Sequence, residues 1–442
     1  MLLGFAAALM AGFFAMGLYV AVALGLVAFS LMYFFADRPL WDILGPMTWN
    51  VNNSFLLAAI PMFVLMGELL IYSGISERMY RALSHWLAPL PGGLLHSNIA
   101  FSGVFGAVSG SSAAATAVVG SVALPAFRAR GYNERLVMGS IAAGGTLDIL
   151  IPPSIAMIIY GVLAEVSIGR LYLAGFIPGF LMVIVFMIII AVVAKIWPSV
   201  APREVSPSLR LRIIGLLSLL PFLALMFIVL GTIYLGVATP TEAAAFGVVG
   251  AFILAAINRQ ISIRMLRQAL LATVRTTSLI MLIVTAAFIM SFALAILGVP
   301  SQLSEWVTGF NLTPVTFVII LVVFYLILGT FMETLSMMVT TVPIIVPVLS
   351  AMGVDLVWFG IIMVILLEAA LISPPEGLNL YVIQGLRRSI QSEHGMEAKG
   401  TITDVWIGVL PFMVGIAIVI ALLIAFPEIA LWLPNLVKGE GG

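Results

Sequence analysis

Long apolar runs separated by short charged loops dominate this chain. Five uncharged runs reach the roughly 20 residues that a helix needs to cross a bilayer. They are residues 1–35, 171–194, 213–240, 276–304 and 405–427. The first run lacks the basic segment of a cleaved signal and is therefore predicted to be a retained span. The pattern predicts an all-α polytopic membrane protein with no soluble domain of useful size.

Composition supports this class and excludes several kinds of chemistry. Of the 442 residues, 63% are hydrophobic and only 9% are charged, whereas soluble domains have about a quarter of charged residues. There is no cysteine, so disulfides and thiol chemistry are excluded. No phosphate-binding Gly-Lys-Ser/Thr loop occurs, and the three histidines show no ligand spacing. The chain is therefore not expected to be an enzyme or to hydrolyse ATP by that mechanism.

Basic residues predict the orientation, because loops rich in Lys and Arg normally stay in the cytoplasm. These residues gather at 78–81, 128–135, 195–212, 259–275 and 387–399. The intervening loops carry few or no bases, at 37–53, 165–170, 235–242, 300–311 and 350–355. Alternating the two sets predicts nine crossings, with the N-terminus inside and the C-terminus outside.

Two long apolar runs do not fit this alternation as single crossings. Residues 92–127 have basic flanks on both sides, whereas residues 312–350 have none on either side. Each run is therefore predicted to form a re-entrant helical hairpin whose two ends lie on one side of the membrane. Polar clusters mark the expected tips, at 109–112 in the first hairpin and at 333–336 in the second.

The two hairpins belong to a predicted inverted repeat. A shift of 222 residues places Pro125 on Pro347, Gly131 on Gly353, Pro152 on Pro374 and Pro153 on Pro375. The flanking loops change from basic to non-basic between the two copies, as expected if the copies have opposite orientations in the membrane. Inverted repeats are common in secondary transporters. The prediction therefore places Arg130 and Gly353 on opposite sides of the membrane.

A span interrupted by tandem prolines follows each hairpin. Residues 144–154 read GGTLDILIPPS, and residues 368–379 read EAALISPPEGLN. Adjacent prolines remove two backbone donors and clash with the preceding turn, so the helix must open. Open backbone at membrane depth persists only where it is buried in protein or lines a polar cavity. One such break is typical of an ordinary kink, but two at repeat-related positions favour ion and substrate sites.

Acidic residues in or beside the apolar spans have no basic neighbour in the sequence. They are Asp148, Glu242, Glu333, Glu368 and Glu376, and no Lys or Arg occurs from residue 276 to 386. An acid at bilayer depth costs about 2.5–3.5 kcal/mol, so each needs a proton, a partner or a cation. Na⁺ or H⁺ is the natural counter-charge. For Glu242 and Glu68, an equally good interpretation is a protonated side chain, or one at the membrane interface, that bonds to a neighbouring helix.

Four motifs together resemble the large membrane subunit of TRAP (tripartite ATP-independent periplasmic) transporters. They are SGSSAA at 109–114, GGTL…IPPS at 144–154, GVATPTEA at 236–243 and PP…GLN at 374–379, and the resemblance covers nearly the whole chain. It implies an elevator-type fold of the ion transporter superfamily, in which hairpins and broken helices move against a fixed scaffold. Asp148 and Glu376 depart from the family pattern, where Gly and a small or apolar residue are common.

The resemblance also implies partners, a coupling ion and a location. Na⁺ would drive import of an organic anion, such as a C4-dicarboxylate, sialic acid or a similar carboxylate or sulfonate. A periplasmic binding protein would deliver this anion to a complex with a small membrane subunit in the bacterial inner membrane. No organic cofactor and no nucleic acid are expected. Two alternatives remain: a stand-alone ion-coupled anion transporter of the same superfamily and, from another class, a channel or intramembrane enzyme.

The predicted parts of the chain follow from the repeat. Residues 1–90 form the N-terminal spans and the scaffold arm of repeat 1, and 91–169 form the first half of the transport domain. Residues 170–275 form scaffold and connecting spans. Residues 276–311 form the scaffold arm of repeat 2, 312–400 the second half of the transport domain, and 401–442 the C-terminal span.

The ion and substrate sites are predicted where the hairpin tips meet the breaks. The cation ligands are expected to be Ser109, Ser111, Ser112, Gly145, Thr146 and Asp148 in repeat 1, and Glu333, Thr334, Ser336, Pro374, Gly377 and Asn379 in repeat 2. The hydroxyl of Ser112 or Thr334 either reaches the ion or caps a half-helix. The anion is expected between the two tips, at Ser111, Ser112, Pro153, Ser154, Ser336, Pro375 and Asn379. Backbone amides at half-helix N-termini would bind it.

Overall fold

The computed structural model describes residues 2–36, 40–109, 111–202, 204, 207–310, 312–393 and 400–438. Throughout these ranges the secondary structure is helical, without a β-strand, so the predicted all-α class is confirmed. Seven helices in the described part are long and apolar enough to cross a membrane, and two further pairs pass the same test together although each is bent. The predicted total of nine crossings stays a prediction, because helix length and composition alone do not fix the membrane.

The first apolar run is two helices, α1 (Leu2–Ala15) and α2 (Val20–Phe35), so its prediction as one span was wrong. The chain turns at Gly17, whose φ of +73° suits glycine. At about 1.5 Å per residue, α1 extends roughly 21 Å, which is shorter than the roughly 30 Å hydrocarbon core. The next helix, α3 (Trp41–Asn52), packs on α14 (Ile263–Ile296).

The predicted first repeat consists of a bent pair, a hairpin, a broken helix and a long span. The pair α4 (Ala59–Tyr72) and α5 (Ile75–Leu87) is bent by 73°. The hairpin is α6 (Leu95–Ser109) and α7 (Ser112–Ala129). The broken helix comprises α8 (Glu134–Gly144), α9 (Leu147–Leu150) and α10 (Ile155–Leu163), with a bend of 44° at the prolines, and α11 (Ile168–Ile196) follows.

The second repeat has the same order of elements. The long helix α14 is followed by α15 (Val299–Gly309) and by the hairpin α16 (Pro314–Leu328) and α17 (Thr334–Ala351). The broken helix comprises α18 (Leu356–Ile372) and α19 (Leu378–Glu393), and α20 (Ile402–Ala425) follows. Between the repeats lie a short 3₁₀ turn (Pro198–Val200), α12 (Leu209–Tyr234) and α13 (Pro240–Ile257). The region predicted as the C-terminal span, residues 401–442, contains α20 and a second, short helix, α21 (Glu428–Lys438), which packs on α11.

Helix caps confirm the repeat spacing at the level of single residues. Ser111 caps α7 by accepting from the amide of Ala114, and Glu333, 222 positions later, caps α17. Asn133 and Asp355 cap α8 and α18 in the same relation. Gly131 and Gly353 precede these caps with φ of +72° and +74°. In each repeat, the second hairpin arm and the broken helix therefore both begin with a side chain that accepts a hydrogen bond from an otherwise unpaired backbone amide.

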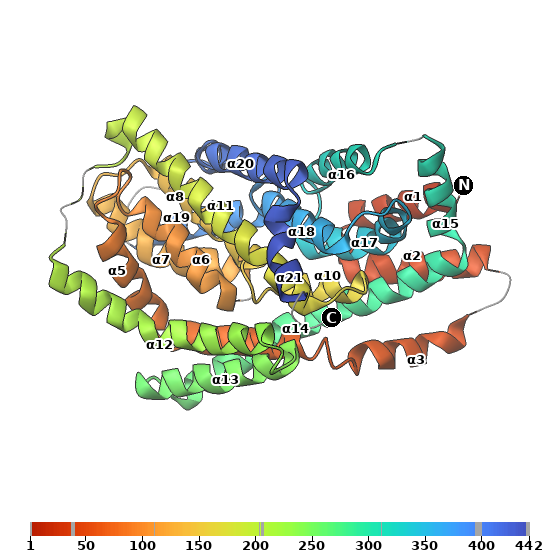
Figure 1. The fold of residues 1–442 in the computed structure, drawn as a ribbon, viewed down its shortest axis with the longest axis horizontal. Helices are drawn as coiled ribbons and strands as arrows, with labels where there is room; N and C mark the ends of the chain where they lie inside the picture. The colour runs from red at the N-terminus through yellow and green to blue at the C-terminus, as the bar shows by residue number, and fades with distance from the viewer. Residues whose placement is uncertain are drawn as a thin grey trace.

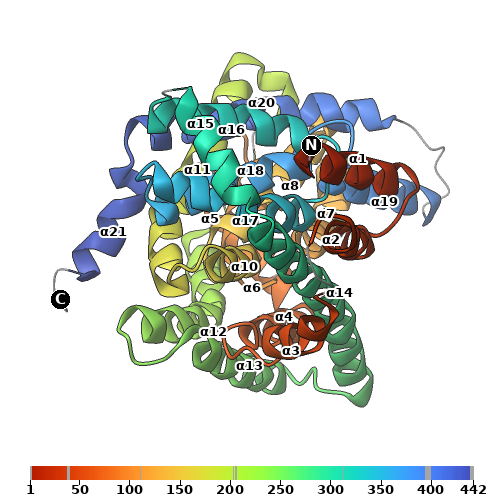
Figure 2. The same ribbon diagram turned by 90° about the vertical axis from the view of Figure 1, so that its right-hand side faces the viewer.

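The two hairpins approach each other from opposite ends of the molecule. Figure 1 shows α6 and α7 on the left and α17 on the right, with α10 and α18 between them. Viewed from the side, α3, α4, α12 and α13 form the lower layer, and α8, α11, α18, α19 and α20 lie above it (Figure 2). The tips consequently meet in the centre, beside the proline breaks. Which layer moves during transport stays a prediction, as do the six boundaries proposed from the sequence.

Candidate functional site

A cavity of about 270 Å³ lies between the two hairpin tips. Both tips contribute, through Ser111, Ser112 and Ala113 at the start of α7 and through Glu333, Thr334 and Leu335 at the start of α17. The broken helices add Asp148, Ile149, Ile155, Ala156, Leu371 and Leu378, and α14 adds Thr276, Leu279 and Ile280. The cavity thus joins both repeats to a long helix of the predicted scaffold.

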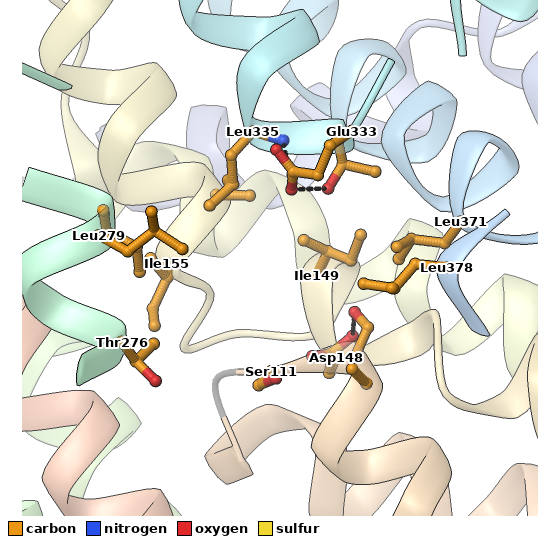
Figure 3. A pocket seen from close by; sticks show the side chains of 15 residues that line it. Ser111, Asp148, Ile149, Ile155, Thr276, Leu279, Glu333, Leu335, Leu371 and Leu378 are labelled. Atoms are coloured by element: carbon orange, nitrogen blue, oxygen red, sulfur yellow. Dashed lines mark hydrogen bonds between the residues drawn. The ribbon is translucent and has the colours of Figure 1, made fainter. Parts of the chain in front are cut away.

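The polar groups lie on opposite walls of this cavity. Figure 3 shows Ser111 and Asp148 along one side and Glu333 on the other, with Ile149 between them and Ile155 and Leu279 to the left. Among the described residues, no Lys, Arg or His contributes to the lining. The cavity therefore has two acidic walls without a basic side chain.

Asp148 is held by the first hairpin. The hydroxyl of Ser112 donates a hydrogen bond to its carboxylate. Gly106 on α6 lets that helix approach closely, since a Cβ built there would lie 2.8 Å from the Cβ of Asp148. The side chain of Asp148 is buried, with 5% of its surface exposed. Its carboxylate is therefore fixed at the point where the hairpin tip meets the first break.

Glu333 is held by its own helix. One carboxylate oxygen accepts from the Thr334 hydroxyl at 3.0 Å and the Leu335 amide at 3.1 Å. The other accepts from the Ser336 amide at 2.9 Å and the Ser336 hydroxyl at 2.8 Å. The positive end of the α17 dipole stabilises this negative charge. The amides of this half-helix are therefore already engaged by an internal anion.

A second cavity, of about 150 Å³, adjoins the first at the second break. Glu333, Thr334, Leu371 and Leu378 line both cavities, and Phe331, Met332, Ala370 and Glu376 complete the smaller one. Glu376 is exposed and has no hydrogen-bond or ion-pair partner among the described residues. The hairpin 2 tip and its own break thus enclose a space with two carboxylates.

Buried oxygen atoms without partners surround the first break. Thr116 on α7 and Asn379 on α19 are fully buried, and neither the Thr116 hydroxyl nor the Asn379 carbonyl oxygen has a hydrogen-bond partner in the described part of the chain. Both side chains lie against Gly145: a Cβ built there would clash with the Thr116 hydroxyl and lie 3.3 Å from the Asn379 amide nitrogen. Because unpaired buried oxygens are costly, this position is suited to a cation.

Glu368 is the most deeply buried acid of the site region. It lies on α18, has no exposed surface, and neither carboxylate oxygen has a hydrogen-bond partner among the described residues. It interacts electrostatically with Asp148. Because a buried carboxylate without a partner is costly, Glu368 needs a proton or a cation beside the first break.

The structure brings five of the predicted residues to the central cavity: Ser111, Ser112, Asp148, Glu333 and Thr334. For the hydroxyls of Ser112 and Thr334, the sequence predicted either ion binding or helix capping. Neither hydroxyl caps a helix, and each donates a hydrogen bond to a carboxylate. The caps are Ser111 and Glu333 because they precede the first helical residue. The side chain of Ser109 lies outside the described residues.

Other predicted residues lie near the cavity without lining it. Thr146 lies in the turn between α8 and α9, and its hydroxyl donates to the carbonyl of Ala143 at the end of α8 at 2.8 Å. Ser154 is buried as the cap of α10, and Gly377 donates its amide to the Ser373 carbonyl at 2.9 Å. Four others also fall outside both linings, namely Pro153, Ser336, Pro374 and Pro375.

The placement of Asn379 with the second hairpin was wrong. Its amide nitrogen donates to the carbonyl of Ala142 on α8 at 3.1 Å, so it contacts the first break. The reason is the packing of α19, which lies against α7 and α8. Asn379 therefore joins the two repeats at one position.

Sequence reasoning missed two members of the site region. Thr116 follows three alanines and gave no signal of its own, because only the fold brings it to Gly145. Glu368 was recognised as an acid in an apolar span but was not assigned to a site. Its isolation in the otherwise apolar α18 was the available signal.

Two helical hairpins, two proline-broken helices and a cavity between the hairpin tips define a polytopic all-helical protein built from two similar repeats. The same fold occurs in the YdaH transporter of Alcanivorax borkumensis, with a TM-score of 0.61 and 15% identity over 94% of this chain and 98% of that one. Residues 7–429 match the DctM component of the tripartite ATP-independent periplasmic transporters. The chain belongs to this family and is a multi-pass protein of the bacterial inner membrane.

Curated relatives carry names that agree with the family. The chain is 33% identical over 393 residues to the C4-dicarboxylate TRAP transporter large permease protein DctM of Pseudomonas aeruginosa, covering 88% of each. It is also 33% identical over 395 residues to the sialic acid TRAP transporter large permease protein SiaM of Vibrio cholerae, again covering 88% of each. The resemblance inferred from the motifs is therefore confirmed. The relatives differ in the substrates that their names give.

Proposed function

We propose that this large permease subunit imports a small organic acid in symport with Na⁺ by an elevator movement. A small membrane subunit would complete the membrane complex, and a periplasmic binding protein would deliver the substrate. The observation that carries the proposal is the cavity between two opposed hairpin tips, lined by acids with no basic partner. Acids at membrane depth need a proton, a partner or a cation, and Na⁺ is the cation that we propose for this cavity.

Na⁺ is proposed to bind first where hairpin 1 meets the first break. Asp148 supplies a fixed carboxylate there, and Thr116 and Asn379 supply oxygens that lack partners. Gly145 and its neighbours add backbone carbonyls of the interrupted helix. Hard cations prefer oxygen ligands of these kinds. A cation bound there would also favour the ionised form of Glu368, which lies close enough to interact with Asp148.

The substrate anion is proposed to bind beside this ion. Ser112 and Ala113 at the start of α7 line the cavity, and the first amides of a helix have no internal partner. The corresponding end of α17 is already engaged by Glu333. The carboxylate or sulfonate of the substrate should therefore approach the α7 side. Asp148 would repel it unless a cation neutralises this acid, so ion and substrate binding are coupled.

An elevator movement is proposed because the cavity includes α14. The tips and breaks all belong to the predicted transport domain, whereas Thr276, Leu279 and Ile280 belong to the predicted scaffold. Thr276 is the one polar residue of the three, and among the described residues none of them forms a hydrogen bond across the cavity to a tip or a break. Sliding along this boundary would carry the loaded site across the membrane.

The test is uptake by liposomes containing this chain and its small membrane subunit, with the loaded binding protein outside. An inward Na⁺ gradient should drive accumulation without ATP, and replacing Na⁺ by K⁺ at constant ionic strength should abolish it. Full uptake without Na⁺ would contradict the proposal and point to H⁺ as the coupling ion. Loss of uptake when the binding protein is omitted separates this system from a stand-alone transporter.

A further inference from the structure

A buried hydrogen bond away from the central cavity joins the predicted scaffold to the predicted transport domain. The hydroxyl of Tyr80 on α5 donates to the side-chain oxygen of Asn98 on α6 at 2.7 Å. Tyr80 has 5% of its surface exposed, and Asn98 has none. α5 packs on α12, and it lies at the left-hand end of the molecule next to the first hairpin (Figure 1). The bond therefore crosses the boundary along which the elevator movement is proposed.

Asn98 is held from a second side as well. Its side-chain nitrogen donates to the Ser140 hydroxyl on α8 at 2.9 Å, and that hydroxyl donates to the carbonyl of Val137 at 2.8 Å. The ring of Tyr80 lies edge-on to Phe101 on α6, with ring centroids 5.7 Å apart. Three buried hydrogen bonds therefore run in sequence from α5 through α6 to α8.

The same face of α6 follows the first broken helix as far as the proposed ion site. A Cβ built at Gly144 would lie 2.8 Å from the Ser102 hydroxyl oxygen. Residues four positions apart lie on one face of a helix, and small residues let membrane helices approach closely. We therefore expect α6 and the broken helix to move as one body. Three pairs mark this seam at intervals of four residues on both sides: Asn98 with Ser140, Ser102 with Gly144, and Gly106 with Asp148.

An elevator movement would have to break the bond between Tyr80 and Asn98. Hairpin 1 and Asp148 would travel together, whereas Tyr80 would stay with α5 on the scaffold. An O–H···O bond needs its two oxygens about 2.5–3.0 Å apart, and a buried polar atom that loses its partner costs free energy. The bond therefore favours the position of the transport domain in this structure over any other position.

We propose that Tyr80 is a positioning residue of the elevator, whose hydroxyl holds hairpin 1 and the ion site at Asp148 in the position seen in this structure. The proposal rests on the proposed function, because it requires a movement of the transport domain against the scaffold. Neither Tyr80 nor Asn98 lines the central cavity. The hydroxyl thus sets the balance between positions and does not touch ion or substrate.

A distance between the two parts of the protein tests the proposal. Because the chain has no cysteine, Ile263→Cys at the start of α14 and Gly385→Cys on α19 place one spin label on each part. Both positions are exposed. Pulsed electron–electron double resonance on the purified complex with the small membrane subunit gives the label distances in Na⁺, in Na⁺ with succinate and in K⁺. We expect two populations, one with the separation of this structure.

Tyr80→Phe removes the hydroxyl and keeps the ring. The ratio of the population with the separation of this structure to the other population should fall roughly five- to tenfold, as expected for one buried hydrogen bond. Tyr325→Phe is the matched control, because the buried Tyr325 hydroxyl donates to Thr341 at 2.6 Å within hairpin 2. This control should lower the thermal unfolding temperature and leave the ratio unchanged.

A double variant tests whether the hydroxyl acts through Asn98. Asn98→Ala removes the acceptor and should lower the same ratio. Residues that act through one shared bond are not additive, so Tyr80→Phe combined with Asn98→Ala should lower the ratio no further than Asn98→Ala alone. Additive shifts would contradict the proposed partnership.

The outcomes distinguish this proposal from the proposed function. Two populations with an unchanged ratio in Tyr80→Phe would overturn the role of Tyr80 and leave the elevator movement intact. An equal fall of the ratio in Tyr325→Phe would also overturn it, because the loss of any buried hydroxyl would then have the same effect. One distance, the same in every condition and every variant, would overturn the elevator movement and this proposal with it.

Discussion

At the scale of single residues, two acids of the cavity obtain their hydrogen bonds in different ways. Asp148 receives its bond from a hydroxyl of a neighbouring hairpin, whereas Glu333 is bound by its own helix. The first acid therefore depends on the position of another element. The second is fixed as soon as α17 forms.

The Ser112 hydroxyl is expected to set the affinity for Na⁺ by orienting Asp148. Losing a residue that holds a metal ligand typically lowers affinity 10- to 100-fold. Ser112→Ala should therefore weaken Na⁺ binding by about tenfold, as measured by the shift of thermal unfolding across a Na⁺ titration. Adding Thr334→Val should weaken binding further only if the second set of predicted ligands also holds Na⁺.

The matched control lies on the same helix. Ser121 is exposed on α7, and its hydroxyl donates to the carbonyl of Val118 at 2.9 Å. Ser121→Ala should leave Na⁺ affinity unchanged. An unchanged affinity in Ser112→Ala as well would contradict an ion-binding role for this hydroxyl.

At the scale of elements, one close helix crossing holds the first broken helix to the C-terminal span. Gly139 on α8 faces Gly408 on α20, and a Cβ at either position would run into the backbone of the other helix. At the same interface Arg135 on α8 donates to Asp404 on α20 at 2.9 Å, and the buried Arg387 lies 3.7 Å from the same carboxylate. Small residues at such crossings let membrane helices approach closely.

Gly139→Ala should destabilise the protein, because the added methyl group would clash with the backbone of α20, which cannot move aside as a flexible side chain can. Overpacking of this kind costs typically about 1–3 kcal/mol. The thermal unfolding temperature of the purified complex should fall accordingly. Gly385→Ala on α19 is the control, since a Cβ there meets no atom within 4 Å. Equal unfolding temperatures for the two variants would contradict this account of the crossing.

The sequence predicted the helix breaks better than it predicted the partners of individual side chains. Prolines and glycines act on their own backbone, so Pro152, Pro153, Pro374 and Pro375 located both breaks and the repeat spacing correctly. Gly17 also turns its own backbone, but the prediction relied on the length of the first apolar run and missed this turn. The partners of Asn379, Thr116 and Glu333 depend on helix packing and on caps, and no local pattern states which helix a side chain will face.

At the scale of the whole molecule, the repeat predicts two halves of opposite orientation. Ala129 and Ala351 end α7 and α17, are 222 positions apart and are both exposed. Because the chain has no cysteine, Ala129→Cys and Ala351→Cys each introduce a single thiol. In intact cells an impermeant maleimide should label Ala351→Cys from outside and reach Ala129→Cys only after permeabilisation. Labelling of both from one side would contradict the inverted arrangement.

The central claim is that Na⁺ and substrate occupy one site region and stabilise each other there. The most direct measurement is the dissociation constant of a probe anion, such as the C4-dicarboxylate succinate, on the purified complex of this chain with its small membrane subunit across a Na⁺ titration, with K⁺ maintaining ionic strength. Affinity should rise with Na⁺, and saturating probe should raise Na⁺ affinity by the same factor, because thermodynamic coupling is reciprocal. A dissociation constant that is the same at every Na⁺ concentration would contradict the account.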